Sequence, residues 1–242
     1  MMTPEINCDM GEGFAIYQVC DDAEMMRHIR IANVACGFHA GDPSVMNRTV
    51  RLAKENGVRV GAHPSFPDAQ GWGRREMRIE REELRDLLIY QVAALKGFLD
   101  LHGIGLNHIK PHGALYGAAT RDEDTAHAIA DVAEIYGVPV FGMANTLHET
   151  IYRARGVGFV AELYADLPYR DDGSLIIMRQ PPKVTIEGVV ARCRRALEEG
   201  VVASIDGNDF PMRFDVICVH SDTPGAVEVA KALQAALARE RT

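Results

Sequence analysis

The sequence predicts an α/β protein whose parallel strands form a closed or nearly closed β/α barrel. Short apolar runs alternate with helical patterns along the 242 residues, and such alternation demands a parallel sheet. Polar or titratable residues stand at the carboxyl ends of six of the seven strand candidates. A barrel gathers those ends around one cavity, whereas an open sheet would spread them along an edge.

The predicted strands of the first half end near titratable side chains, namely Asp9, His39 and His63. Helices are predicted over residues 21–29, 43–56 and 80–102. The second helix has the clearest limits, because Asp42 suits its N-cap, Pro43 its first position and Gly57 its end. Residues 65–75 form a long glycine-rich loop, and connections of that length tend to be functional.

The remaining strands are expected to end near Lys110, Met143, Glu162 and His220. Helices are predicted over 122–136, 146–155, 186–199 and from Thr223 almost to the last residue. Residues 201–209 are typical of a strand with a hairpin turn, and residues 180–183 are expected to be irregular. The chain contains no linker or low-complexity tract, so we expect one domain over residues 1–242.

The composition is that of a globular protein and excludes several classes. Hydrophobic residues make up 47% of the chain, charged residues 25%, and the formal net charge is −8. This acidic balance lacks the basic footprint that phosphate neutralisation needs, so we expect no nucleic-acid partner. No run approaches the roughly 20 apolar residues of a spanning helix, and residues 1–9 lack a secretion signal. We therefore expect no membrane partner.

The five cysteines are scattered and contain no CxxC pair. That pattern is typical of reduced thiols in a cytoplasmic protein, and it disfavours a disulfide framework or a structural zinc site. Cys8, Cys36 and Cys218 lie in apolar strand-like runs, so we expect them to be small buried hydrophobic residues. No thiol is assigned as a nucleophile.

The strand ends supply the candidate site. Taken singly, His39 or His63 is more often a packed histidine than a ligand, and Lys110 could be solvated. Their repeated position at strand ends favours a shared site instead. The candidate catalytic residues are Asp9, Glu12, His39, His63 and Lys110.

Two chemistries remain open for Asp9, His39 and His63. A divalent metal with open positions would accept an Asp/His/His set. The same residues could act without metal, as an acid/base group and orienters around a polarised carbonyl. Lys110 suits an anion or a phosphoryl group. The sequence has neither a Walker A motif nor a GxGxxG, so ATP would have to be held in another way.

Several blocks of the sequence closely resemble the LamB/YcsF family. They span almost the whole chain in the expected order: Asn7–Glu12, Asn33–Pro43, Gly61–Ser65, Gly71–Arg75, Lys110–Tyr116 and His220–Ala226. The resemblance implies a distorted, TIM-like seven-stranded barrel of the glycoside hydrolase/deacetylase superfamily type. It also implies the role of the A subunit in an ATP-dependent 5-oxoprolinase. Such an enzyme opens 5-oxo-L-proline to L-glutamate together with two further, urea-amidolyase-like subunits.

This resemblance suggests roles for the candidate residues. Phosphorylation of the lactam oxygen would let water attack, so Lys110 and Arg74–Arg75 would suit the phosphate charge. Asp9, Glu12, His39 or His63 would position water or Mg²⁺. Further candidates for substrate or phosphate binding are Asn7, His112, Glu162, Asp166, His220 and Asp222.

The sequence departs from the family at Leu167, where an arginine usually follows the Ala-Asp pair. If that arginine binds the substrate carboxylate, the substrate here could be a related lactam or amide. Two other functions remain as alternatives. One is a stand-alone metal-dependent amide hydrolase or deacetylase, and the other is a noncatalytic regulatory subunit that binds a small carboxylate.

Overall fold

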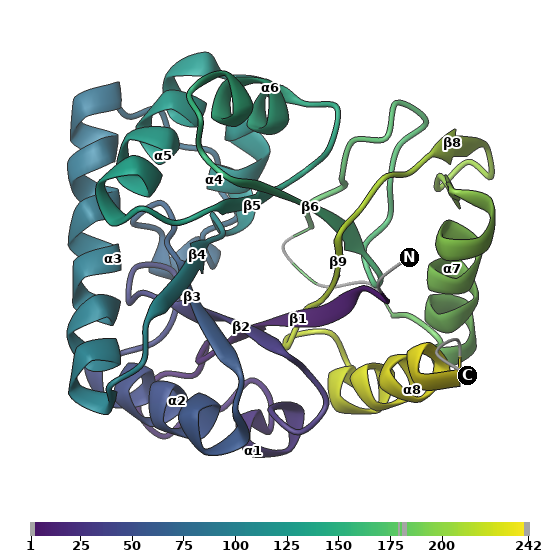
Figure 1. Cartoon of the computed structure of the whole chain (residues 1–242), viewed down its shortest axis with the longest axis horizontal. Helices are drawn as coiled ribbons and strands as arrows, with labels where there is room; N and C mark the ends of the chain where they lie inside the picture. The colour runs from purple at the N-terminus through teal and green to yellow at the C-terminus, as the bar shows by residue number, and fades with distance from the viewer. Residues whose placement is uncertain (1–2, 179, 181–182, 240–242) are drawn as a thin grey trace.

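The computed structural model describes residues 3–178, 180 and 183–239, and within them seven parallel strands close into a barrel (Figure 1). The strands are β1 (Glu5–Met10), β2 (Ile31–Ala35), β3 (Arg59–His63), β4 (Leu106–Ile109), β5 (Val140–Gly142), β6 (Phe159–Tyr164) and β9 (Val216–Val219). They follow one another around the barrel in chain order, and β9 pairs with β1 to close it. The predicted β/α barrel is confirmed. The stretch predicted to be irregular, 180–183, lies partly outside the described residues.

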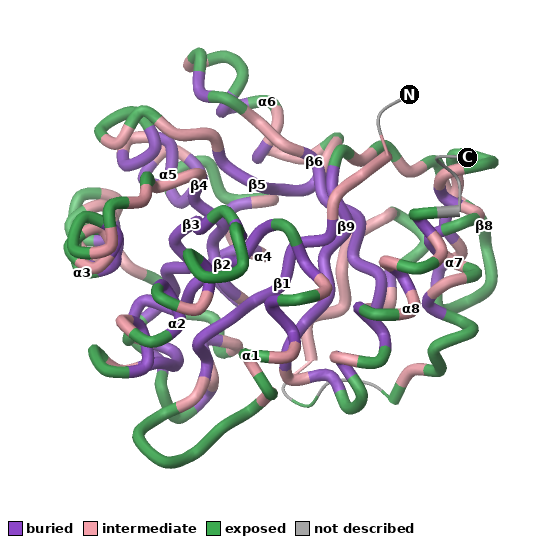
Figure 2. The backbone as a smooth tube through the Cα atoms, turned by 60° about the horizontal axis from the view of Figure 1, so that its bottom comes forward, coloured by how far each residue is buried: buried purple, intermediate pink, exposed green. Residues whose placement is uncertain are grey.

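Helices surround the barrel, and the chain is buried mainly along the strands (Figures 1 and 2). The longer helices are α2 (Pro43–Asn56), α3 (Arg81–His102), α5 (Glu123–Tyr136), α6 (Leu147–Ala154), α7 (Ile186–Glu199) and α8 (Ala226–Arg239). The shorter ones are α1 (Asp22–Met25), the 3₁₀ turn η1 (Ala69–Gly71) and α4 (Gly113–Ala119). None of the helices in the described residues is long and apolar enough to cross a bilayer.

Helix α2 has the predicted limits. The Asp42 carboxylate accepts hydrogen bonds from the backbone N–H groups of Ser44 and Val45, at 2.8 and 3.0 Å. Pro43 occupies the first turn, and Gly57 ends the helix in the left-handed conformation with φ 64°. The N-cap, the proline of the first turn and the terminal glycine therefore act together to fix both ends of the helix.

Some predicted boundaries were wrong. Strand β2 ends at Ala35, so His39 lies in a loop beyond the strand. The reason is Gly37, whose φ of 90° breaks the extended run and lets its N–H donate to the carbonyl of Ala40. Helix α1 ends at Met25 and continues only as turns over residues 26–28. Helix α4 was not predicted at all.

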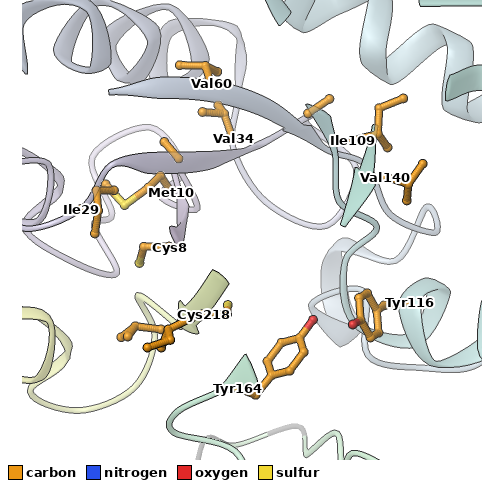
Figure 3. Packing of buried hydrophobic residues seen from close by; sticks show 14 of the residues in the cluster. Cys8, Met10, Ile29, Val34, Val60, Ile109, Tyr116, Val140, Tyr164 and Cys218 are labelled. Atoms are coloured by element: carbon orange, nitrogen blue, oxygen red, sulfur yellow. The ribbon is translucent and has the colours of Figure 1, made fainter. Parts of the chain in front are cut away.

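The strands alternate between a polar interior and an apolar exterior. In β1, Cys8 and Met10 point to the core between strands and helices (Figure 3), whereas Asn7 and Asp9 bond to groups inside the barrel. Two residues below Asn33 in β2, Ile31 joins Phe141 and Val216 in a separate apolar cluster. This small cluster forms a dry floor beneath the polar interior.

The predicted strand and turn at residues 201–209 form a hairpin outside the barrel. Strands β7 (Val201–Ala203) and β8 (Asp209–Pro211) pair antiparallel. The hairpin therefore does not contribute to the ring of strand ends. Its strand β7 contacts α7, which also packs against α8.

Candidate active site

A pocket opens at the carboxyl ends of the strands. Six of the sequence-predicted residues line it: Asp9, His63, Arg74, Lys110, His112 and His220. They come from β1, β3 and the loops that follow β3, β4 and β9. The barrel therefore brings together side chains that are far apart in the chain.

The base of the pocket is a hydrogen-bonded polar layer. The Asn33 amide donates to Asn7 Oδ1 and to Asp9 Oδ1, both at 2.8 Å. His108 Nε2 lies 2.7 Å from Asn33 Oδ1, and that oxygen can only accept, so the nitrogen carries the proton. The His108 ring stacks on Phe141 at 3.8 Å between ring centroids. Asn7 thus supports Asp9 from below and does not line the pocket.

The His108 ring fits only because residue 61 is glycine. A Cβ atom at Gly61 would lie 2.1 Å from His108 Cε1. Contacts that short do not occur between real side chains, so any other residue would displace the ring. The bond from His108 to Asn33 depends on this gap in strand β3.

Lys110 lines the pocket beside Asp9. Its Nζ is 2.7 Å from Asp9 Oδ1, 2.9 Å from Cys218 Sγ and 3.7 Å from Glu162 Oε1. Burial works against the charged form, but Asp9, Cys218 and Glu162 hold the pKa of Lys110 well above its usual value. Likewise, burial is outweighed by the charges of His63 and Lys110, which hold the pKa of Asp9 well below its usual value. Lys110 and Asp9 therefore form a buried ion pair.

Two tyrosines also line the pocket. The Tyr164 hydroxyl donates to Glu162 Oε2 at 3.0 Å, and its ring lies 5.4 Å from Lys110 Nζ. Tyr116 and Tyr164 point their hydroxyl groups toward each other (Figure 3). Burial raises the pKa of Glu162, although Lys110 opposes this rise.

Asp166 holds His220 at the mouth of the pocket. Its carboxylate accepts from the His220 backbone N–H at 2.9 Å and from the Thr223 hydroxyl at 2.8 Å, and lies 2.8 Å from His220 Nδ1. Burial lowers the affinity of the ring for a proton, but Asp166 prevails and raises the pKa of His220 to about 9. His220 Nε2 lies 3.7 Å from Asp9 Oδ2. Asp166 is thus a positioning residue, and His220 faces the pocket.

A second buried cluster, here called the histidine cluster, consists of Glu12, His39, His63 and His112. His39 Nε2 lies 3.0 Å from Glu12 Oε1, and His63 Nε2 lies 2.9 Å from His112 Nδ1. Burial raises the pKa of Glu12 to about 7 and lowers that of His39 to about 3. Of the predicted Asp9, His39 and His63 set, His63 Nε2 lies 3.2 Å from Asp9 Oδ2, whereas His39 contacts Glu12 instead.

The two arginines of the Gly71–Arg75 block have different partners and different exposure. Arg74 Nη2 donates to Asp222 Oδ2 at 2.7 Å, and Arg74 lines the pocket. Arg75 instead pairs with Asp68, and 52% of its side chain is exposed. Arg75 is therefore separated from the predicted site, since the buried Asp68 carboxylate holds it within its own loop. Asp222 pairs with Arg74 but does not itself line the pocket.

Sequence reasoning missed several site residues. Tyr164 and Cys218 were not chosen, although each lies two residues from a chosen one, Glu162 and His220. The period of two along a strand could have indicated both. All five cysteines are unpaired, and Cys8, Cys36 and Cys218 are buried as predicted, but Cys218 also contacts Lys110.

A β/α barrel with buried carboxylate, ammonium and imidazole groups at its strand ends has the architecture of a barrel enzyme. The chain belongs to the LamB/YcsF family, whose pattern matches residues 4–242. The resemblance drawn from the sequence blocks is thereby confirmed.

Named relatives cover nearly the whole chain. The lactam utilization protein lamB of Emericella nidulans is 46% identical over 93% of this chain and 90% of its own length. The 5-oxoprolinase A subunits of Natranaerobius thermophilus and Bacillus subtilis are 42% and 40% identical, each over 97% of this chain and 93% of their own length. Their names support an enzyme that acts on a lactam.

Solved structures agree with the fold. The lactam utilization protein from Thermus thermophilus superposes with a TM-score of 0.91 at 38% identity, over 99% of this chain and 98% of that one. A family 4 carbohydrate esterase from Streptomyces lividans has a TM-score of 0.52 at 11% identity, over 99% and 91% of the two chains. The second match concerns the barrel alone.

Proposed function

We propose that this chain is the A subunit of an ATP-dependent 5-oxoprolinase, which opens 5-oxo-L-proline to L-glutamate together with two partner subunits. The observation that carries the proposal is the buried Lys110–Asp9 pair at the base of a pocket formed by the strand ends. The names of the relatives support the lactam as the substrate class. A cytoplasmic location is part of the proposal, because the reaction consumes ATP and the five cysteines are free thiols.

The chemistry explains the need for ATP. A lactam is a poor electrophile, since its nitrogen donates electron density to the carbonyl. Transfer of the γ-phosphoryl group to the lactam oxygen makes the ring carbon open to attack by water. Breaking the ring C–N bond then frees the amine and leaves γ-glutamyl phosphate. A second water molecule cleaves this acyl phosphate, so the products are glutamate, ADP and phosphate. Each of these steps develops negative charge on oxygen, which buried cations stabilise.

The residues of the pocket suit this sequence of steps. Lys110 and Arg74 place positive charge beside the lactam and phosphoryl oxygens. Glu12, His63 and His112 surround the position proposed for the attacking water. His220 carries a proton at neutral pH, because its pKa is raised to about 9, and we assign it to protonate the departing ring nitrogen. Leu167 also lines the pocket, so a related lactam without a carboxylate there is the alternative substrate.

ATP would enter by a groove that continues from the pocket. This groove shares Arg74, Tyr116, Leu175 and Ile177 with the pocket. It also contains Arg121 and Arg170, beside the carboxylates of Glu76 and Asp172. Arginine guanidinium groups suit phosphate oxygens. In the proposal the triphosphate lies in this groove with its Mg²⁺, and its γ-phosphate points to Lys110.

The test is glutamate formation from 5-oxoproline by the purified chain combined with both partner subunits. We expect activity only when ATP and all three proteins are present. Turnover of an amide by the chain alone, without ATP, would identify a stand-alone hydrolase instead. Thermal stabilisation by 5-oxoproline with no turnover in the complete mixture would identify a regulatory carboxylate-binding subunit. Either of these two results overturns the proposal.

A further inference from the structure

His63 and His112 face each other in an arrangement that neutral imidazoles alone do not satisfy. His63 Nδ1 lies 2.7 Å from the carbonyl oxygen of Lys110, and His112 Nε2 lies 2.8 Å from that of Trp72. A carbonyl oxygen can only accept a hydrogen bond, so each of these nitrogens carries its ring's proton. The other two nitrogens, His63 Nε2 and His112 Nδ1, therefore present lone pairs to each other across 2.9 Å.

Two carboxylates lie beside this contact. Glu12 Oε1 lies 3.6 Å from His112 Nδ1, and Asp9 Oδ2 lies 3.2 Å from His63 Nε2. The side chains of Glu12, His63 and His112 are at most 3% exposed, so the contact is buried. Lone pairs and carboxylates that converge in a buried space require a cation between them.

The cation is either an additional proton or a metal ion. Metal-binding histidines usually donate their second ring N–H to a backbone carbonyl or a carboxylate, which fixes the tautomer. Both His63 and His112 show this pattern.

We propose that Glu12, His63 and His112 bind a divalent metal of the zinc type, through Glu12 Oε1, His63 Nε2 and His112 Nδ1. Two histidines and a glutamate form a known catalytic zinc set, which leaves a position open for water or substrate. Ligand atoms at about 2.0–2.2 Å from a tetrahedral ion lie about 3.4 Å apart. The separations of 2.9 and 3.6 Å lie on either side of that value.

His39 is a positioning residue in this site and not a ligand. Its ring stacks on His112 at 3.7 Å between centroids, with the two planes 5° from parallel. An ion in the plane of His112 would lie well outside the plane of His39, where no lone pair points. His39 Nε2 instead lies 3.0 Å from Glu12 Oε1 and orients that carboxylate. Asp9 is not assigned as a ligand, because Lys110 and Asn33 bond to its Oδ1 and because it groups with Cys218 and His220 and not with Glu12 and His112.

The binding of this metal does not rest on the proposed function, whereas its place in lactam opening does. The open position faces the pocket, since His63 and His112 both line it. There a metal would supply Lewis acidity to water or to the substrate carbonyl. The metal site and the lactam activity can therefore be tested separately.

The binding test uses the isolated full chain, freed of metal by a chelator. Zn²⁺ is titrated calorimetrically, and Co²⁺ is followed by its visible absorption, which is intense only in a tetrahedral site. We expect one equivalent of either metal to bind. The substitutions Glu12→Gln and His112→Gln should weaken binding at least 100-fold, and His39→Asn should weaken it about 10- to 100-fold at the same stoichiometry. His102→Gln, at the end of α3, should bind like the unmodified chain.

Far-UV circular dichroism checks that each variant folds. A second measurement needs no substitution: Zn²⁺ should shift the ¹⁵N resonances of His63 Nε2 and His112 Nδ1 in the unmodified chain. Absence of stoichiometric binding, or equal binding by Glu12→Gln and His112→Gln, overturns the proposal. So do ¹⁵N resonances that Zn²⁺ leaves unchanged and that report a shared proton. Loss of lactam activity with metal binding intact would count against the proposed function only.

Discussion

Lys110 Nζ lies 2.7 Å from Asp9 Oδ1, and this contact joins the carboxyl ends of strands β4 and β1 across the barrel. Lys110→Met should reduce ATP-dependent glutamate formation at least about 100-fold. It should also lower the free energy of unfolding by roughly 3–5 kcal/mol, since Asp9 is left buried without its cation. The double variant Asp9→Asn/Lys110→Met should recover most of that stability but no activity. Urea denaturation and the three-subunit assay measure the two effects, and a fully active Lys110→Met would contradict the assignment.

The two neighbouring arginines provide a matched comparison. Arg74 lines the pocket and pairs with Asp222, whereas Arg75 is half exposed and pairs with Asp68. Arg74→Gln should raise the KM for 5-oxoproline or lower kcat by about tenfold or more, because it removes a buried charge-assisted contact. Arg75→Gln should change either constant less than about twofold. Equal effects of both substitutions would show that the loop acts as a whole.

The groove beside the pocket predicts a specific effect on the nucleotide. Arg121→Gln should raise the KM for ATP about 5- to 10-fold and leave the KM for 5-oxoproline unchanged, because Arg121 lines the groove and not the pocket. Steady-state kinetics at saturating concentrations of the other substrate measure each constant. Arg85→Gln, on the exposed side of α3, is the control. An equal rise in both KM values would place the triphosphate elsewhere.

The Asp166–His220 pair predicts a pH-dependent stability. In the folded chain the pKa of His220 is about 9, above its usual 6.5, so its contribution is complete below pH 6.5 and is lost as the pH rises through 9. The free energy of unfolding of the unmodified chain should exceed that of His220→Gln by up to about 3 kcal/mol more at pH 6 than at pH 10. Urea titrations at a series of pH values give this difference. A gap that does not change with pH would contradict a charged His220.

Two glycines should respond in opposite directions to alanine. A Cβ at Gly73 would lie 2.3 Å from Ser65 Oγ and 2.8 Å from His39 Cβ, in a residue with φ 64°. Gly73→Ala should therefore lower the free energy of unfolding by about 1–3 kcal/mol and disturb the histidine cluster. Gly97 is exposed in helix α3 with no neighbour near a Cβ, so Gly97→Ala should stabilise the chain by about 0.5–1 kcal/mol. Thermal and urea unfolding compare the two variants.

Patterns along the chain were sufficient to predict the barrel. The order of strands and helices follows from local periodicity and caps, such as Asp42 and Gly57 around α2. Their positions at strand ends predicted that Asp9, His63 and Lys110 would be neighbours, because the carboxyl ends of parallel strands gather at one end of a barrel. The end of β2 was misplaced, since the apolar run continues past the glycine that breaks the strand.

The details of the site depend on distances between strands, which the sequence does not contain. Residue type suggested that His39 would join Asp9, but the loop after Ala35 carries His39 over to Glu12. Arg75 was expected beside Arg74, yet a buried carboxylate earlier in the same loop holds it outside the pocket. Which nitrogen of His63 or His112 carries a proton depends on carbonyl groups from other elements. Contacts of this kind become visible only in the three-dimensional structure.

The space left by Gly61 makes the residues at positions 61 and 108 depend on each other. Because the His108 ring fills the space of a missing side chain, neither position can change freely while the other stays. A lineage that acquired a larger residue at position 61 would first need a smaller one at position 108, and it would then lose the bond to Asn33 beneath Asp9. Across related sequences, substitutions at positions 61 and 108 should therefore occur together.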